Sequence, residues 1–199
     1  MKKVALLFIV LGLLILANVG VGFAAVSGAT PPKGGLPMLL TNAGQGPGGK
    51  MARLLINTSK ALDPADFDYN AEPWEKDLQA RPYKTLIVVI GSTAKGLGAS
   101  GITIDQEIAR LNRMIAEAKR LKMQIVAVLL EGKIRRGQPG SADERSIDAI
   151  APYADYIVVK KDGNADGKFT AIANKNKVPL TFIDAEIDFP QVIKEMYAK

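Results

Sequence analysis

Five short runs of contiguous apolar residues constrain the fold more than any other feature of this sequence. They lie at 36–40 (LPMLL), 85–90 (TLIVVI), 124–130 (QIVAVLL), 155–159 (DYIVV) and 179–183 (PLTFI), and a weaker candidate strand lies at 66–70. Runs without polar alternation are typical of strands buried on both faces, and such strands belong to parallel sheets covered by helices.

Helical patterns fill the intervals between these runs, at 50–61, 104–121, 142–151, 167–175 and 190–198. Thr103 with Gln106, and Ser141 with Glu144, have the spacing of capping boxes at two of the helix starts. Alternation of strand and helix predicts an α/β fold: one doubly wound, mostly parallel sheet of about five or six strands, flavodoxin-like or Rossmann-like, in a single domain over 36–199.

The N-terminus has the pattern of a secretory signal peptide. Lys2 and Lys3 precede an apolar run over 4–17, and small residues follow up to Ala24. We expect residues 1–24 to be removed, with a second candidate cut after Ala29, and residues 25–35 to form a linker. An uncleaved anchor over 4–26 is the alternative, since a stretch of 23 residues can span a bilayer. Both readings place the domain outside the cytoplasm, as a secreted, periplasmic or cell-surface protein.

The amino-acid composition excludes several kinds of catalytic and metal-binding site. The chain contains no cysteine and no histidine, which excludes disulfides, thiolate nucleophiles, imidazole bases and histidine-ligated metals. The net charge is +6, or +4 without Lys2 and Lys3, and the basic residues are spread along the chain. This favours a small anionic ligand or an anionic envelope surface over nucleic acid. No cofactor and no metal is predicted.

Two glycine-rich loops follow apolar runs. Gly44, Gly46 and Gly49 satisfy G-x-G-x-x-G after the first run, and Gly96, Gly98 and Gly101 satisfy it after the second. Such loops expose backbone N–H groups to an anion at a helix start. Pro47 argues against the dinucleotide-binding form of the motif, and turns without a ligand remain the alternative.

Two further loops carry charge. Arg135 and Arg136 follow the run at 124–130, where paired arginines can grip a carboxylate or phosphate. Residues 162–167 (DGNADG) match the first half of a calcium loop, but Ala173 stands where the bidentate glutamate belongs. Asn164 or Asp166 capping the next helix is therefore the preferred interpretation.

Because ligands bind beyond the carboxyl ends of parallel strands, we expect these loops to border one pocket. The predicted ligand-binding residues are Thr41, Asn42, Gln45, Gly46, Ser92, Thr93, Lys95, Gly96, Gly98, Arg135 and Arg136.

Several segments resemble a domain-of-unknown-function family of small exported proteins from bacteria and archaea. They are LPMLLTNAGQ at 36–45, GSTAKGLGASGI at 91–102, Arg-Arg-Gly at 135–137, APYADYIVV at 151–159 and GNADGKFT at 163–170. The resemblance covers roughly 36–184. It implies export and an α/β domain, and it implies no reaction.

The sequence thus predicts a non-catalytic binding module for a small anionic ligand. Two alternatives stay open. One is an accessory subunit that binds an envelope protein, with membrane contact only through the N-terminal segment. The other is a hydrolase or transferase that uses Glu131, Asp162 or Asp184 together with Lys95.

Overall fold

Seven strands form a single sheet in the computed structural model, which describes residues 25–198. The strand order is β1-β7-β6-β5-β4-β2-β3, and only β1 runs antiparallel to its neighbour. The strands are β1 (Val26–Gly28), β2 (Met38–Ala43), β3 (Phe67–Tyr69), β4 (Thr85–Ile90), β5 (Gln124–Leu129), β6 (Tyr156–Lys160) and β7 (Leu180–Ile183). All five predicted apolar runs and the weaker strand are therefore confirmed as parallel strands of one sheet.

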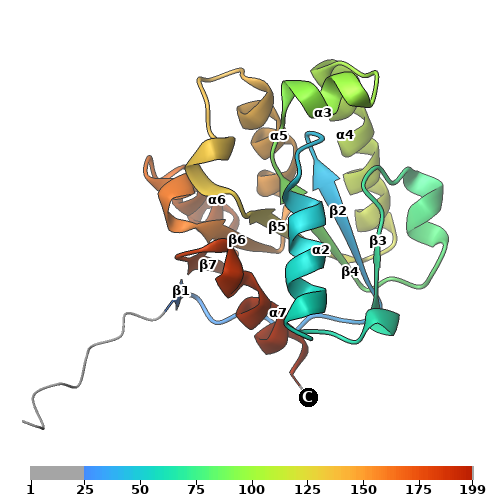
Figure 1. The fold of residues 1–199 in the computed structure, drawn as a ribbon, viewed down its shortest axis with the longest axis vertical. Coiled ribbons are helices and arrows are strands. Elements are labelled where there is room, and N and C mark those ends of the chain that lie inside the picture. Colours follow the sequence, from blue (N-terminus) through green and yellow to red (C-terminus); the bar gives the residue numbers. More distant parts are fainter. Residues whose placement is uncertain (1–24, 199) are drawn as a thin grey trace, which may run out of the picture.

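Helices cover both faces of the sheet (Figure 1). They are α2 (Gly48–Thr58), α3 (Ala94–Ala99), α4 (Ile104–Arg120), α5 (Ala142–Ile150), α6 (Lys168–Asn176) and α7 (Phe189–Tyr197). α2 and α7 bury their apolar sides on one face, and α4, α5 and α6 bury theirs on the other. The predicted doubly wound α/β domain is confirmed.

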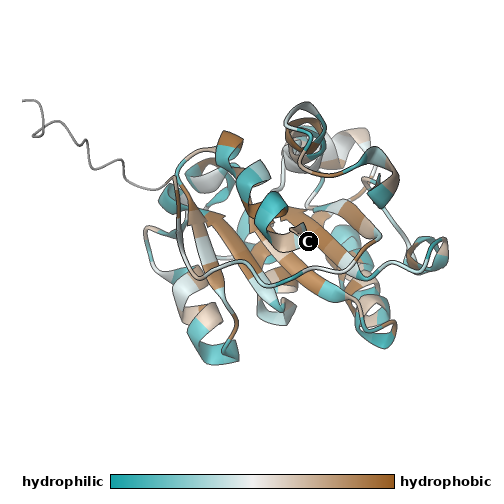
Figure 2. Ribbon diagram, turned by 90° about the horizontal axis from the view of Figure 1, so that it is seen from below, coloured by the Kyte–Doolittle hydropathy of each residue, from teal (hydrophilic) through white to brown (hydrophobic). Residues whose placement is uncertain are grey.

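The contiguous apolar runs follow from this two-sided covering. In β4, Leu86 and Val88 point to the α4 side, whereas Ile87 and Val89 point to the α2 side. Successive strand residues face opposite sides of a sheet, so both sets must be apolar when helices cover both. Figure 2 shows the apolar strands of the sheet in brown, between helices whose ribbons alternate between hydrophilic and hydrophobic residues.

The helix starts confirm one predicted capping box and modify the other. At α4, the Thr103 hydroxyl accepts from the Gln106 amide at 3.3 Å, and the Gln106 side chain accepts from the Thr103 amide at 2.8 Å. At α5, Ser141 accepts from the Glu144 amide at 3.4 Å, but the Glu144 carboxylate binds Arg136 instead of returning to the cap.

The predicted linker at 25–35 is instead part of the folded domain. β1 pairs with β7, and the carbonyl of Ala29 accepts the Thr181 hydroxyl at 2.6 Å. The chain then crosses the amino ends of the strands, where the Gly34 amide donates to the carbonyl of Met196 at 2.9 Å. Pairing of β1 covers the β7 edge, which would otherwise expose unpaired backbone groups. The predicted signal peptide at 1–24 lies outside the described residues.

Within residues 25–198, none of the helices combines the length and apolar character that crossing a membrane requires.

The strand order places a topological switch point at β2. The chain passes from β2 to β3 on one side and then returns to β4 on the other side of β2. The loops that follow β2 and β4 therefore diverge from adjacent strands, and ligands of open α/β sheets bind at such a position.

Candidate functional site

The loops after β2 and β4 meet at the carboxyl edge of the sheet, as predicted. Gln45 and Ser92 form an antiparallel bridge, and the Gly46 amide donates to the carbonyl of Gly91 at 2.8 Å. The first turn of α3 lies directly against the β2 loop, since a Cβ on Gly96 would stand 1.8 Å from the Gln45 carbonyl oxygen. The two glycine-rich loops thus form one unit.

A hollow of about 370 Å³ lies between this unit and the start of α2. Its lining residues are Gln45, Gly46, Pro47, Lys50, Thr93, Lys95, Gly96 and Ala99. We call this hollow the crevice. Proline, alanine and glycine make much of its wall apolar, and Lys50 and Lys95 supply its two cationic groups.

Five of the eleven predicted residues line the crevice: Gln45, Gly46, Thr93, Lys95 and Gly96. Thr41, Asn42 and Ser92 do not line it, because each is at least 96 % buried at a strand end. Gly98 lies outside it and faces open space. The sequence prediction missed Pro47, Lys50 and Ala99, of which Lys50 was visible as the first charged residue after the glycine motif.

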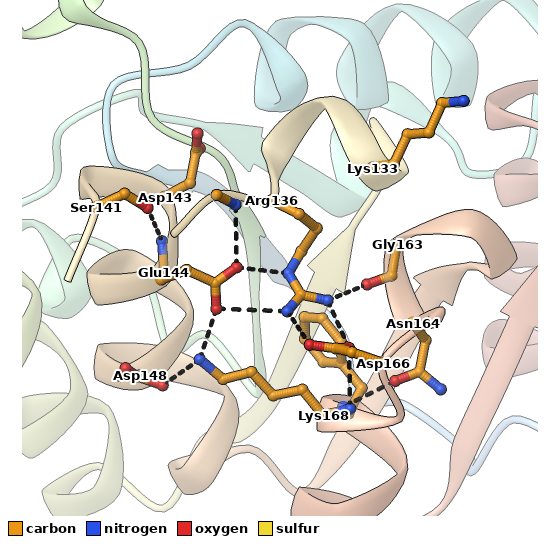
Figure 3. Close-up of polar contacts among 12 residues, drawn as sticks. Lys133, Arg136, Ser141, Asp143, Glu144, Asp148, Gly163, Asn164, Asp166 and Lys168 are labelled. Atoms are coloured by element: carbon orange, nitrogen blue, oxygen red, sulfur yellow. Dashed lines mark hydrogen bonds and ion pairs between the residues drawn. The ribbon is translucent and has the colours of Figure 1, made fainter. Parts of the chain in front are cut away.

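Arg136 does not reach the crevice, which corrects its predicted role. Its guanidinium binds Glu144 and Asp166, each at 2.6 Å, and also donates to the carbonyl of Gly163 (Figure 3). Lys168 completes the cluster, with its ammonium 2.8 Å from Glu144. Two carboxylates satisfy this arginine, so it holds the β5 and β6 loops against α5 instead of binding a ligand.

The Arg135 side chain contacts the loop after β4 from the buried side of that loop and does not line the crevice. It pairs with Glu131 at 2.9 Å and donates to the carbonyl of Ser92 at 2.9 Å. The Ser92 amide in turn donates to Asp143 at 2.6 Å, and burial raises the pKa of the Asp143 carboxyl. Arg135 therefore fixes the backbone of the β4 loop without lining the crevice.

Three buried atoms of this cluster have no hydrogen-bond partner among the described residues: Ser92 Oγ, Glu131 Oε2 and Arg135 Nε. Buried polar atoms without partners are uncommon in native proteins. They lie within a packed region, because a Cβ on Gly91 would meet Arg135 at 2.8 Å and Glu131 at 3.4 Å.

A buried ion pair between Glu107 and Arg110 supports the crevice and was not predicted. Glu107 accepts two hydrogen bonds from Arg110, at 2.7 and 2.9 Å, and one from the Gly44 amide at 2.9 Å. It also accepts the Gln45 side-chain amide at 3.2 Å. Burial raises the pKa of Glu107, but Arg110, the Gly44 amide and the Gln45 side chain together outweigh burial and hold that pKa below its ordinary value. The pair fixes Gln45, whose φ of 61° is in the left-handed region.

The segment at 162–167, which resembles half of a calcium loop, instead supplies hydrogen bonds to the start of α6 and an ion pair to Arg136. Asn164 Oδ1 accepts from the Phe169 amide at 2.8 Å, and Asp166 accepts from the Lys168 amide at 3.1 Å. The hydrogen bond from Arg136 also lowers the pKa of Asp166 to about 2. The prediction was that Asn164 or Asp166 caps this helix; both side chains accept amides of the first turn of α6, and the N-cap residue itself is Gly167.

The chain belongs to a family described as "Domain of unknown function (DUF6305)", whose model matches residues 35–197. This confirms the resemblance to a domain-of-unknown-function family. A comparison with curated proteins finds no significant match.

Comparison with solved structures finds distant likenesses. The psychrotrophic esterase EstA from Pseudoalteromonas sp., in a structure inhibited by monoethylphosphonate, is 8 % identical. The match covers 80 % of this chain and 94 % of EstA, with a TM-score of 0.35. A GDSL-like lipase from Bacteroides thetaiotaomicron is 9 % identical over 72 % of this chain and 65 % of the lipase, with a TM-score of 0.31. TesA is 13 % identical over 72 % of this chain and 76 % of TesA, with a TM-score of 0.28. Likeness at this level carries no conclusion about activity.

Proposed function

We propose that this protein is an extracytoplasmic, non-catalytic binding module that holds a small organic anion in the crevice. The main support for this proposal is the lack of partners, among the described residues, for the two lysines that line the crevice. Neither Lys50 nor Lys95 has an ion pair or a side-chain hydrogen bond with another residue between 25 and 198. Cations that no carboxylate neutralises are available to an anion.

The start of α2 adds to this preference. Its N-cap is Pro47, which makes no side-chain capping hydrogen bond, and the first turn carries no acidic residue. The first amides of a helix and its dipole favour a negative charge, and α2 itself supplies no acid there. The carboxylate near this end is that of Glu131, which is paired with Arg135.

The wall composition indicates what the rest of the ligand is like. Pro47, Ala99 and the glycine backbone offer apolar contact between the two lysines. A carboxylate or phosphate on a compact apolar body matches this arrangement better than a bare inorganic ion, because the body gains from leaving water.

The hydrolase alternative finds no support in the arrangement of its proposed residues. Among residues 25–198, no acidic side chain lines the crevice that holds Lys95. Glu131 pairs with Arg135, and Asp184 pairs with Lys161. Asp162 accepts the Lys133 amide at 3.2 Å and lies 4.0 Å from the Lys160 ammonium. The carboxylates therefore stand apart from the lysine with which they were expected to act.

A thermal-shift screen of organic anions tests the proposal, using the chain from Ala25, which contains every described strand. A ligand at a hundred times its Kd stabilises the folded state by about 2.7 kcal/mol. We expect Lys95→Ala and Lys50→Ala each to lose about 1–3 kcal/mol of binding free energy to an anion that the screen finds, the scale of a charge-assisted hydrogen bond.

Lys175→Ala is the matched control. Lys175 is exposed on α6 and has no ion pair or hydrogen bond among the described residues, so its removal changes the net charge equally. The proposal fails if no organic anion shifts the melting temperature, or if Lys175→Ala weakens binding as much as Lys95→Ala does.

A further inference from the structure

The first 62 residues of the chain contain no aspartate or glutamate. Within that stretch, α2 carries Lys50 and Arg53 one turn apart, and Lys60 follows the end of the helix. All three are exposed, and none has an ion pair or a side-chain hydrogen bond within residues 25–198. Arg53 instead lies over the ring of Tyr69, 5.6 Å from its centre. The cations therefore form a row that no acidic side chain of α2 interrupts.

Hollows accompany this row along its whole length. One of about 300 Å³ lies between α2 and β3 and is lined by Arg53 and Asn57 together with residues up to Tyr69. The next, of about 590 Å³, is lined by Asn57 and Lys60 with the segment 62–64. The two share Asn57 and Pro64, so they adjoin. Lys50, which is one helical turn before Arg53 in α2, lines the crevice.

The crevice lies at the start of α2, and the two adjoining hollows lie farther along α2, where β3 runs beside the helix. Figure 1 shows α2 and β3 side by side. We call the crevice and the two hollows together the α2 groove. At 1.5 Å per residue, the helix from Lys50 to its end at Thr58 is about 12 Å long. Lys60 lies just beyond that end, so the row of cations spans roughly 15 Å.

Two carboxylates border the groove, and both already have partners. Asp68 accepts the Tyr83 hydroxyl at 2.6 Å and pairs with Arg81 at 2.8 Å. Asp63 accepts the Ala65 amide at 2.8 Å. Asp68 is thus paired with a cation, whereas the charge of Asp63 beside Lys60 is not neutralised. The cations Lys50, Lys95, Arg53 and Lys60 still outnumber that one carboxylate along the groove.

We propose that the α2 groove binds a linear oligo-anion, with a phosphate or carboxylate on each unit, whose end group occupies the crevice. This inference rests on the proposed function and extends it from one anionic group to a chain of them. Cations in a row beside successive hollows match a repeating chain, whereas a flat bilayer surface would contact projecting side chains instead.

The test compares anions of one chemistry and increasing length. Binding to the chain from Ala25 is measured by calorimetry with orthophosphate, tripolyphosphate and longer polyphosphate, and in a second series with galacturonate and its oligomers. We expect affinity to rise with length until the oligomer spans about 15 Å, because each further unit meets another cation of the row.

The variant Arg53→Ala with Lys60→Ala removes two cations of the groove and leaves the crevice lysines in place. We expect it to weaken long oligomers by roughly fourfold to 25-fold, at about twofold to fivefold for each exposed charge. Binding of the single-unit anion should not change. The matched control is Lys175→Ala with Lys194→Ala, which removes two exposed lysines of other helices and should leave both unchanged.

The outcomes separate this inference from the proposed function. A single-unit anion that binds in a Lys95-dependent way, with no gain from length, overturns the groove and leaves the crevice. Equal losses in the control variant overturn it too, since net charge alone would then explain the binding. Binding to phosphatidylglycerol vesicles without binding to soluble oligomers would likewise overturn it. If no phosphate or galacturonate of any length binds, this inference fails, and the proposed function is then decided by the organic-anion screen alone.

Discussion

The buried pair of Glu107 and Arg110 offers the sharpest test of how the crevice is held in place. Glu107 is fully buried and Arg110 is 97 % buried, and two of the four hydrogen bonds to the Glu107 carboxylate come from Arg110. Arg110→Met removes those two bonds and leaves a buried carboxylate bound only by the Gly44 amide and the Gln45 side chain. Breaking a buried pair in this way typically costs about 3–5 kcal/mol of unfolding free energy.

The cost should depend on pH with a defined sign. In the native protein the pKa of Glu107 is lowered, so the pair contributes stability above the unfolded-state pKa of about 4.3, and that contribution is lost as pH falls through the folded-state pKa. Without Arg110, only the hydrogen bonds from Gly44 and Gln45 oppose the effect of burial, so the pKa of Glu107 should rise. The loss of unfolding free energy in the variant should therefore become smaller as pH falls, because protonation neutralises the buried carboxylate.

Urea unfolding of both proteins at pH 7 and at pH 4 measures this effect. We expect the difference in unfolding free energy to be largest at pH 7 and clearly smaller at pH 4. Adding Glu107→Gln to Arg110→Met should recover part of the loss at pH 7, since it removes the unpaired charge. A difference below about 1 kcal/mol, or one that does not vary with pH, would refute the account of this pair.

Helix α4 supplies its own control. Glu117 and Arg120 have the same residue types at the same spacing as Glu107 and Arg110, but the arginine is 62 % exposed. Surface ion pairs contribute little because water and salt screen them. Arg120→Met should therefore leave the unfolding free energy nearly unchanged at either pH.

Two further predictions follow from the glycines and from β1. Gly96→Ala should destabilise the protein and separate the two loops, because the new Cβ would lie 1.8 Å from the Gln45 carbonyl oxygen. Gly98 is in the same helix, but a Cβ there would meet nothing within 4 Å. Gly98→Ala should therefore stabilise the protein by up to about 1 kcal/mol. Thermal unfolding of both variants checks this, and equal effects would contradict it. Mass spectrometry of the native protein should find an N-terminus at Ala25 or earlier, because a cut after Ala29 would remove β1. A native chain that begins at Thr30 would contradict that expectation.

The strands and helix starts that depend on residues close together in the chain could be predicted from the sequence. Each apolar strand and the Thr103 cap depend on residues close together in the chain, so periodicity and spacing reveal them. The carboxyl-edge crevice followed from parallel topology alone. β1 was missed because a strand of three residues exists only through its pairing with β7, more than 150 residues away. α3 was missed because two of its six residues are glycine, so its formation depends on packing against the β2 loop.

The ion pairs were not predictable, because sequence does not show which charges meet. Arg136 was expected at a ligand, and its partners Glu144 and Asp166 come from two other elements. For Glu107 and Arg110 a signal did exist. They occur among the residues that α4 turns toward the sheet, where Leu111 and Met114 are also buried. A charged pair on an otherwise apolar helix face indicates a buried interaction, but this signal was not used in the sequence prediction.

The glycine motifs were the clearest functional signal in the sequence, and the structure assigns their glycines a different physical role. A Cβ on Gly46 would stand 2.5 Å from the carbonyl oxygen of Gly91, so this glycine permits two backbones to touch. The amides that were expected to face a ligand are also in use, since Gly46 donates to Gly91 and Gly96 donates to the Thr93 hydroxyl. The anion binding that we propose for the crevice would therefore come from Lys50, Lys95 and the first turn of α2, and it should depend on those two lysines far more than on the glycine spacing.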